Sequence, residues 1–326
     1  MNRKIAVMMG SDSDFGTMKG IIPVLQENDI DYEFRVISAH RTPLIAAEFA
    51  QKAKTDGYDL IIAGAGMSAH LPGVLAAFTG VPIIGVPIKS DSSGMDGMDA
   101  LHSVIQMPPG IPVATVGIDH AEGAAKLAVK MINCYRNMHS DNHLKRTVRI
   151  VYNRNEVSEE NLKKAISVLD TYGINHIILD MTDITKKEIT SDRDTPYPKE
   201  VIKELSSSDN NTFVILNLAG INVEEIIKTD EYAKEIPIVE VPQKAPSNGF
   251  NDTSNKVYDQ TQNSESTAFV GVNSYQNAAH IIARIVGIHD QAVYDGVVNE
   301  HAKLAAAVIE KDAKIRSEVN DGKKKM

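Results

Sequence analysis

The stretch from residue 4 to residue 43, KIAVMMGSDSDFGTMKGIIPVLQENDIDYEFRVISAHRTP, decides the fold. An apolar run over Ile5–Met9 is followed by a helical pattern from Asp14 to Asn28 and by a second β-type run over Tyr32–Ile37. A further helical pattern begins at Pro43. Strands that read as apolar runs and alternate with helices predict a parallel sheet covered on both faces.

The same alternation continues through the first half of the chain. The remaining predicted strands and helices are Leu60–Ala63, Val81–Pro87 and Val113–Gly117, and Pro43–Asp56, Leu71–Phe78, Gly97–Ile105 and Ala121–Asn133. We therefore predict a three-layer α/β domain over residues 1–136. Its ligands should bind at the carboxyl ends of the strands.

A polar stretch over residues 137–146 predicts a linker, and residues 147–326 resemble a second copy of the first half. Three segments match in the same order: Val24-Leu25 with Val168-Leu169, Val81–Pro87 with Ile236–Pro242, and Gly117 and Ala124-Ala125 with Gly271 and Ala278-Ala279. Of the 21 glycines, 14 precede residue 147, so the second copy has lost turns that let a backbone approach a ligand closely. We predict a second three-layer α/β domain with its own parallel sheet, a degenerate repeat of the first with a structural role.

Two segments of the second half have their own patterns. The polar, Ser/Asn-rich stretch Gln243–Glu265 predicts a mobile loop in the place of the apolar 88–111 segment. The run from Gln291 to Lys314 has helical spacing and no counterpart between the halves.

Composition excludes several functional classes. A chain of 326 residues suits two domains of about 150 residues each. The net charge of -9 and the absence of Trp argue against a nucleic-acid partner, and no apolar run approaches the ~20 residues of a membrane span. A single cysteine, Cys134, and a start without a signal sequence predict a cytoplasmic protein.

Two polar turns follow the first two predicted strands. Gly10-Ser11-Asp12-Ser13-Asp14 offers N–H groups and hydroxyls at a helix N-terminus, which suits a phosphate or ribose but equally a plain N-cap. Because a carboxylate repels phosphate, Asp14 is better suited to ribose hydroxyls.

The second turn, residues 38–43, places His40 and Arg41 at the same edge of the sheet. Histidine is suited to proton transfer, and the arginine guanidinium is a planar fork of hydrogen-bond donors. Alone such a pair is more often a surface feature, and its position beside the first turn favours a site.

The third turn, Gly64-Ala65-Gly66-Met67-Ser68-Ala69-His70-Leu71-Pro72-Gly73, could close over a flat ring. It lacks the third glycine of the dinucleotide fingerprint, which disfavours NAD. His70 is either a second polar contact or a packed structural histidine, and the residues alone favour the latter. The segments 89–99 and 106–112 are typical of a lid and its hinge, or of a solvated loop.

Taken together, these turns and Gln106-Met107-Pro108 resemble the 5-(carboxyamino)imidazole ribonucleotide mutase family, also called the phosphoribosylaminoimidazole carboxylase catalytic subunit, over residues 4–133. The resemblance implies a flavodoxin-like fold with His40 as general acid/base. It implies that the ribose-phosphate part of the substrate is bound by Ser11, Asp14 and Arg41. The implied pocket neighbours are Ser13, Ser38, Ala69, His70 and Leu71.

By the same resemblance, the substrate loses its carbamate carboxylate as CO2, which is held and added to the adjacent ring carbon. One histidine can give and take the proton, so no cofactor or metal is expected, and the sequence shows no metal-ligand spacing. The turn Ala69-His70-Leu71-Pro72 is similar to the mutase branch. Direct carboxylation of aminoimidazole ribonucleotide with CO2 remains the alternative.

The second half departs from the family pattern, with Ile184 opposite His40 and Thr185 opposite Arg41. Family members resemble homo-octamers of single domains, so a fused chain is expected to form a homotetramer with four live sites. Its partner would be a small-molecule ribonucleotide, without nucleic acid or membrane. A non-catalytic ribonucleotide-binding regulator is the alternative from another class. An electron carrier is disfavoured by the few aromatic residues.

Overall fold

The computed structural model describes residues 3–134, 147–182, 212–219, 221–228, 233–244 and 250–324, together with residues 205 and 230. The predicted linker at 137–146 and positions 184 and 185 lie outside these ranges. The described elements of the first half are β1 (Lys4–Met9), η1 (Asp12–Asp14), α1 (Phe15–Met18), α2 (Ile21–Glu27), β2 (Asp31–Val36), α3 (Pro43–Lys52), β3 (Leu60–Gly66), α4 (Leu71–Phe78), β4 (Ile83–Ile88), α5 (Met98–Ile105), β5 (Ala114–Thr115) and α6 (Ala121–Asn133). Those of the second half are β6 (Thr147–Tyr152), α7 (Glu159–Thr171), β7 (Asn175–Asp180), β8 (Thr212–Asn217), α9 (Val223–Ile227), η3 (Ala233–Glu235), β9 (Ile238–Glu240), α10 (Phe250–Gln262), β10 (Thr267–Phe269), α11 (Tyr275–Gly287) and α12 (Gln291–Lys324).

The strands form one ten-stranded sheet in the order β2-β1-β3-β4-β5-β10-β9-β8-β6-β7. Neighbours within each half are parallel, which confirms the predicted mostly parallel α/β architecture. The halves meet at the antiparallel pair β5–β10, where Phe269 lies opposite Thr115. The structure thus differs from the expectation that each half has a separate sheet. Joining β5 to β10 pairs backbone groups that two isolated sheets would leave at an edge.

The strand order of the second half has the same pattern as that of the first. Reading outward from the junction, the first half runs β5-β4-β3-β1-β2 and the second runs β10-β9-β8-β6-β7. In both halves the first strand of the half lies between its second and third strands. This arrangement is what a repeat of one α/β unit would produce.

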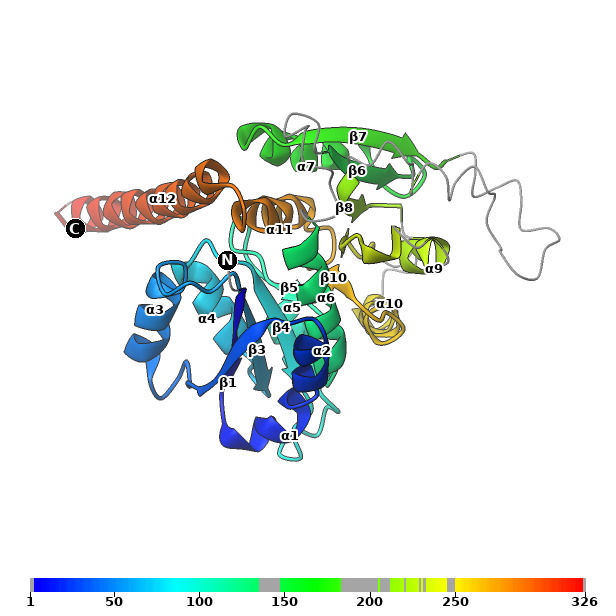
Figure 1. Cartoon of the computed structure of the whole chain (residues 1–326). Coiled ribbons are helices and arrows are strands. Elements are labelled where there is room, and N and C mark those ends of the chain that lie inside the picture. Colours follow the sequence, from blue (N-terminus) through cyan, green and yellow to red (C-terminus); the bar gives the residue numbers. More distant parts are fainter. Residues whose placement is uncertain are drawn as a thin grey trace.

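The first half has helices on both faces of its sheet (Figure 1). On one face, small side chains of α3 such as Ala46 and Ala50 pack with Leu75 of α4 and the strand residue Ile61. On the other face, the cluster that includes α2 and α6 also contains residues of α7 and α11. One core therefore continues from the first half into the second.

Helices α4 and α6 have the predicted bounds, whereas the predicted helix from Asp14 to Asn28 is broken into η1, α1 and α2. Gly20 lies at the break between α1 and α2, Gly16 lies within the short α1, and Pro23 within α2 donates no backbone hydrogen bond. The break leaves α1 as a short turn over the end of β1. This positions Met18 beneath the third turn of the candidate site.

The predicted loop Gln243–Glu265 is wrong over Phe250–Gln262, where the structure has helix α10. Val257 of this helix is buried against Ile105 and Phe269. The helix approaches so closely that a Cβ at Gly117 would lie 2.7 Å from the Thr261 carbonyl oxygen. Composition misled the prediction because the helix buries few side chains, at positions three and four residues apart.

Helix α12 packs on the first half near its start and then projects from the body (Figure 1). Tyr294 contacts Gly80, and Leu304 contacts Gly110, where an added Cβ would lie 2.9 Å and 2.4 Å from these side chains. The predicted helical run is confirmed and is longer than expected. Among the described residues, no helix has the length and apolar character that a membrane crossing requires.

Candidate active site

The turn after β1 is closed by its own serine and aspartate side chains. Ser11 is the N-cap of η1, and its Oγ accepts a hydrogen bond from the Ser13 N–H at 3.3 Å. The Asp14 carboxylate accepts one from the Ser11 N–H at 3.2 Å. Burial raises the pKa of the Asp14 carboxyl, although the hydrogen bonds from Ser11 and Ser13 oppose the shift. The capping interpretation is therefore right for Ser11, and it coexists with a place in the cavity described below.

The turn after β2 is held by Ser38 and Thr42. The Thr42 N–H donates to the Ser38 carbonyl at 2.8 Å, and the Ser38 N–H donates to Thr42 Oγ1 at 3.0 Å. Ser38 Oγ accepts from the Arg41 N–H at 3.2 Å. These bonds fix the backbone, so His40 and Arg41 are presented by a defined turn with exposed side chains. Pro43 then begins α3, as the preset φ of proline allows.

The turn after β3 requires a residue without a side chain at its start. A Cβ at Gly64 would lie 2.5 Å from Met18 Sδ and 2.8 Å from Ile88 Cδ1. Four residues beyond Gly66, the last residue of β3, the chain reaches His70, the N-cap of α4. Met67, directly after the strand, has a φ of 54°. The close approach at Gly64 brings the first and third turns together.

His40 and His70 form a hydrogen-bonded pair across these turns. His40 Nε2 lies 2.9 Å from His70 Nδ1, with ring centroids 5.0 Å apart and ring planes at 68°. One ring donates while the other accepts, so the pair is a possible path for a proton. Both side chains are exposed to the same cavity.

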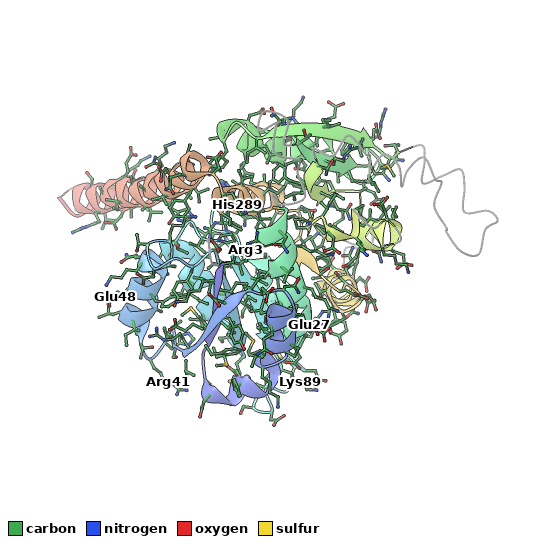
Figure 2. The ribbon with its side chains drawn as sticks, in the orientation of Figure 1. Arg3, Glu27, Arg41, Glu48, Lys89 and His289 are labelled. Carbon is green, nitrogen blue, oxygen red and sulfur yellow. The ribbon has the colours of Figure 1, made fainter. Side chains whose placement is uncertain are left out.

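The three turns and the loop after β4 enclose a cavity of about 450 Å³. Its lining residues are Gly10, Ser11, Ser13, Asp14, Ser38, Ala39, His40, Arg41, Ala65, Gly66, Met67, Ser68, His70, Leu71, Ser90 and Ser92. Figure 2 shows Arg41 and Lys89 at the end of the first half that faces away from the second half. The cavity therefore lies at the carboxyl edge of the parallel strands, as predicted.

The predicted site residues line this cavity, with the exception of Ala69. Ala69 is 1% exposed and belongs to the hydrophobic cluster that contains Leu75, because its methyl group faces the core below α4. The residue-based preference for His70 as a packed histidine was wrong, since its side chain is exposed and faces His40.

Sequence reasoning did not assign Ser90 and Ser92 to the site, although both line the cavity. They lie in the segment that was predicted to be a lid. That loop is tied back by an ion pair between Lys89 and Asp96 at 2.7 Å and by a hydrogen bond from Ser93 to Asp99 at 2.7 Å. The sequence carried a signal for these serines, because a loop that follows a central parallel strand starts at the carboxyl edge of the sheet, where ligands bind.

A second cavity, of about 470 Å³, lies between α6 and α9. Both lysines and glutamates line it; Lys228 pairs with Glu225 within the lining, and Lys126 pairs at 2.9 Å with Glu122 outside it. Its lining contains no histidine. Proton-transfer chemistry is therefore better supported at the carboxyl edge of the first half.

Comparisons with known proteins match mainly the first half of the chain. The AIR carboxylase family model matches residues 4–154. N5-carboxyaminoimidazole ribonucleotide mutases of Pyrococcus abyssi and Pyrococcus horikoshii are 56% and 52% identical over 40% and 39% of this chain and over 74% and 71% of their own lengths. The phosphoribosylaminoimidazole carboxylase of Saccharomyces cerevisiae is 47% identical over 40% of this chain and 23% of its own length. With relatives of this identity matched over more than two thirds of their length, the chain belongs to the AIR carboxylase family.

Proposed function

We propose that this chain acts in purine biosynthesis by converting 5-(carboxyamino)imidazole ribonucleotide to 4-carboxy-5-aminoimidazole ribonucleotide. The observation that carries the proposal is the His40–His70 pair at 2.9 Å within a cavity lined by small and hydroxyl side chains. The mutases of the same family, at 56% and 52% identity, support the choice of substrate.

His40 is the proposed general acid/base. The carbamate N–C bond breaks, CO2 leaves, and protonated His40 supplies a proton to the nitrogen that keeps the electron pair. The adjacent ring carbon then attacks CO2 and forms a new C–C bond. Neutral His40 removes the proton from that carbon, which restores the aromatic ring and the starting protonation state. His70 is placed to orient the His40 ring through its hydrogen bond.

The remaining cavity residues suit the ribose phosphate. Ser11 and Ser13 present hydroxyls beside a helix start, and Asp14 presents a carboxylate that can accept from ribose hydroxyls. Arg41 is the one lysine or arginine among the lining residues. It is therefore the proposed partner of the phosphate dianion.

Replacing Arg41 with methionine is expected to raise KM for the ribonucleotide roughly 10- to 100-fold, with a smaller effect on kcat. The reason is that one charge-assisted hydrogen bond to phosphate contributes roughly 1.5–3 kcal/mol. Steady-state kinetics at varied substrate concentration measures the split. Arg35→Met is the matched control, because Arg35 lies on β2 outside the cavity and pairs with Glu33 at 3.2 Å. An unchanged KM in Arg41→Met would contradict the phosphate role.

The substrate is tested by comparing turnover of 5-(carboxyamino)imidazole ribonucleotide with turnover of aminoimidazole ribonucleotide plus bicarbonate. Preference for the carbamate supports the mutase proposal. Preference for aminoimidazole ribonucleotide would assign the chain to direct carboxylation, the activity named for the yeast relative. No turnover of either substrate, with binding retained, would favour a regulator.

The finer organisation is part of the same proposal: a catalytic domain at 1–136, a linker at 137–146, and a degenerate repeat at 147–326. The matching strand order of the two halves supports a duplication. At the start of the second half, the position of the first glycine-rich turn is occupied by Asn153, which is buried, and by Arg154, which pairs with Asp180. These side chains fill the turn with structural contacts, which suits an inert copy.

We also propose a homotetramer that presents four active sites. Beyond its packed start, α12 exposes an apolar stripe, with Val308, Ile315 and Val319 exposed by 65%, 61% and 51%. Their spacing of seven and four residues places them on one side of a helix, which suits packing against another copy.

The tetramer predicts a mass by light scattering of about four times the 35.5 kDa of one chain. Ile315→Glu is expected to shift the mass toward smaller species, since a carboxylate would be buried in the contact. Ser317→Glu, which introduces the same carboxylate at an exposed position on the opposite side of this helix, is the control. A mass near that of one chain for the unaltered protein would contradict the proposal.

A further inference from the structure

Two buried polar side chains of α11, in the second half, bind backbone groups of the first half. They are Asn277 and Arg284, which are 3% and 1% exposed. Seven residues separate them, so they lie on the same side of the helix two turns apart. Neither residue lines the cavity at the carboxyl edge, and both act on α4, the helix whose N-cap is His70.

Both the oxygen and the nitrogen of the Asn277 side-chain amide form hydrogen bonds with the segment before β5. Its Oδ1 accepts from the Gly110 N–H at 2.8 Å, and its Nδ2 donates to the Met107 and Pro108 carbonyls, both at 3.1 Å. Three bonds from one planar group define the path of the segment. An apolar side chain at this position would leave the buried Gly110 N–H without this partner and would remove the bonds to the Met107 and Pro108 carbonyls.

Met107 transmits this placement to the first turn of α4. A Cβ at Gly73 would lie 3.0 Å from Met107 Sδ and 3.1 Å from its Cε, so the thioether packs directly on the glycine. Gly73 is the third residue of α4 and lies one turn beyond His70. The glycine leaves room for the methionine, and the methionine limits how far the start of α4 can move.

Arg284 holds the other end of α4. Its Nη2 donates to the Ala76 carbonyl at 3.0 Å and its Nη1 to the Val81 carbonyl at 3.3 Å. A cation at the carboxyl end of a helix satisfies carbonyls that have no partner within the helix. Nε2 of His301, in α12, lies 2.8 Å from Arg284 Nη2. Burial and the Arg284 charge lower the pKa of His301 to about 4, so the ring is neutral and its Nε2 accepts the hydrogen bond.

We propose that α11 positions the acid/base pair of the first half, with Asn277 and Arg284 as positioning residues that fix α4 at its two ends. The position of α4 sets the distance from His70 Nδ1 to His40 Nε2. The second half then contributes to turnover without having a site of its own. The inference rests on the proposed function, because turnover is what it measures.

If Asn277 and Arg284 position His70, the effect of replacing them on kcat depends on the presence of His70. A general stabilising role has no such dependence. Asn277→Leu keeps the branched shape of the side chain and removes the three hydrogen bonds. It is expected to lower kcat roughly 10-fold or more, with KM within about twofold, because small displacements of a catalytic group have large kinetic effects. Gln276→Leu is the matched control, since Gln276 is the exposed neighbour on the same helix.

The deciding experiment is a double-mutant cycle on kcat in the full chain, with Asn277→Leu combined with His70→Asn. If Asn277 acts through α4 and His70, Asn277→Leu should cost less than about twofold once His70 is replaced. The same loss in both backgrounds, or a loss no greater than that of Gln276→Leu, would overturn the inference.

A second variant keeps the test decisive if Asn277→Leu does not fold. Arg284→Lys retains the buried charge but cannot span both carbonyls, and it enters the same cycle with the same expectation. Absence of turnover in the unaltered chain would overturn both the proposed function and the positioning role. Turnover in the unaltered chain with an additive cycle would overturn the positioning role alone.

Discussion

The His40→Asn variant is expected to lose roughly 10³-fold or more in kcat while it still binds the ribonucleotide. General acid/base groups contribute about 10²- to 10⁴-fold, and in the proposed reaction His40 both gives and takes the proton. Asparagine can keep the hydrogen bond to His70 but cannot transfer a proton. The groups proposed to bind the ribose phosphate are other side chains, Ser11 and Asp14 on the first turn and Arg41 next to His40, so affinity should change little.

Two measurements are needed for this variant: steady-state kinetics and binding by calorimetry. His70→Asn is the matched comparison, because it removes the other ring of the pair, 2.9 Å away, and should cost less in kcat. The assignment of His40 would fail if His40→Asn kept kcat within about tenfold of the unaltered chain, or if His70→Asn were the more damaging substitution.

The location of this site could be predicted because its turns are local. A strand, a short polar turn and a helix are specified by neighbouring residues, as Pro43 at the start of α3 and Gly64 at the end of β3 illustrate. Parallel strands then bring the turns to one edge whatever the remaining details. The contact between His40 and His70 is not local, since it depends on how α4 packs.

Apart from Ser90 and Ser92, the main features that sequence reasoning missed depend on contacts between distant segments. Helix α10 is polar on most sides, so its sequence predicts a loop, yet Val257 packs against Ile105 of the first half. The junction of β5 with β10 involves very short strands without a pattern of their own. The bonds from Asn277 and Arg284 reach across about 170 and 200 residues of chain, as their partners Met107 and Ala76 show.

Glu240 is a buried carboxyl at the position where the first half has Gly85. It is 8% exposed, its Oε2 accepts from Asn217 Nδ2 at 3.0 Å, and its Oε1 accepts from Gln260 Nε2 at 3.0 Å. Burial, together with the charge of Glu224, raises its pKa to about 7, while the Asn217 hydrogen bond and Lys256 act in the opposite direction. The carboxyl therefore titrates close to neutral pH in the folded chain.

This shift predicts that stability falls as pH rises from about 4.5 to about 7. The folded chain keeps the Glu240 proton up to a pKa of about 7, whereas the ordinary value is 4.5, so the folded state binds more protons in this window. The contribution is fully present below pH 4.5, is lost up to about pH 7, and is constant above it. The shift corresponds to at most about 3 kcal/mol of the free energy of unfolding.

Glu240→Gln removes the titration, so at pH 8 this variant should be more stable than the unaltered chain by up to about 3 kcal/mol, and the advantage should shrink toward pH 5. Gln260 Oε1 is a buried atom without a partner among the described residues. Once the Gln260 amide flips, this oxygen faces residue 240 and can accept a hydrogen bond from the N–H of the new glutamine. Urea unfolding at pH 5, 6, 7 and 8 measures the difference. Glu235→Gln, at an exposed glutamate nearby, is the control and should show no such trend. A stability difference that is the same at pH 5 and pH 8 would show that Glu240 is already ionised in the folded chain, because only a carboxyl that holds its proton through this window makes folding depend on pH there.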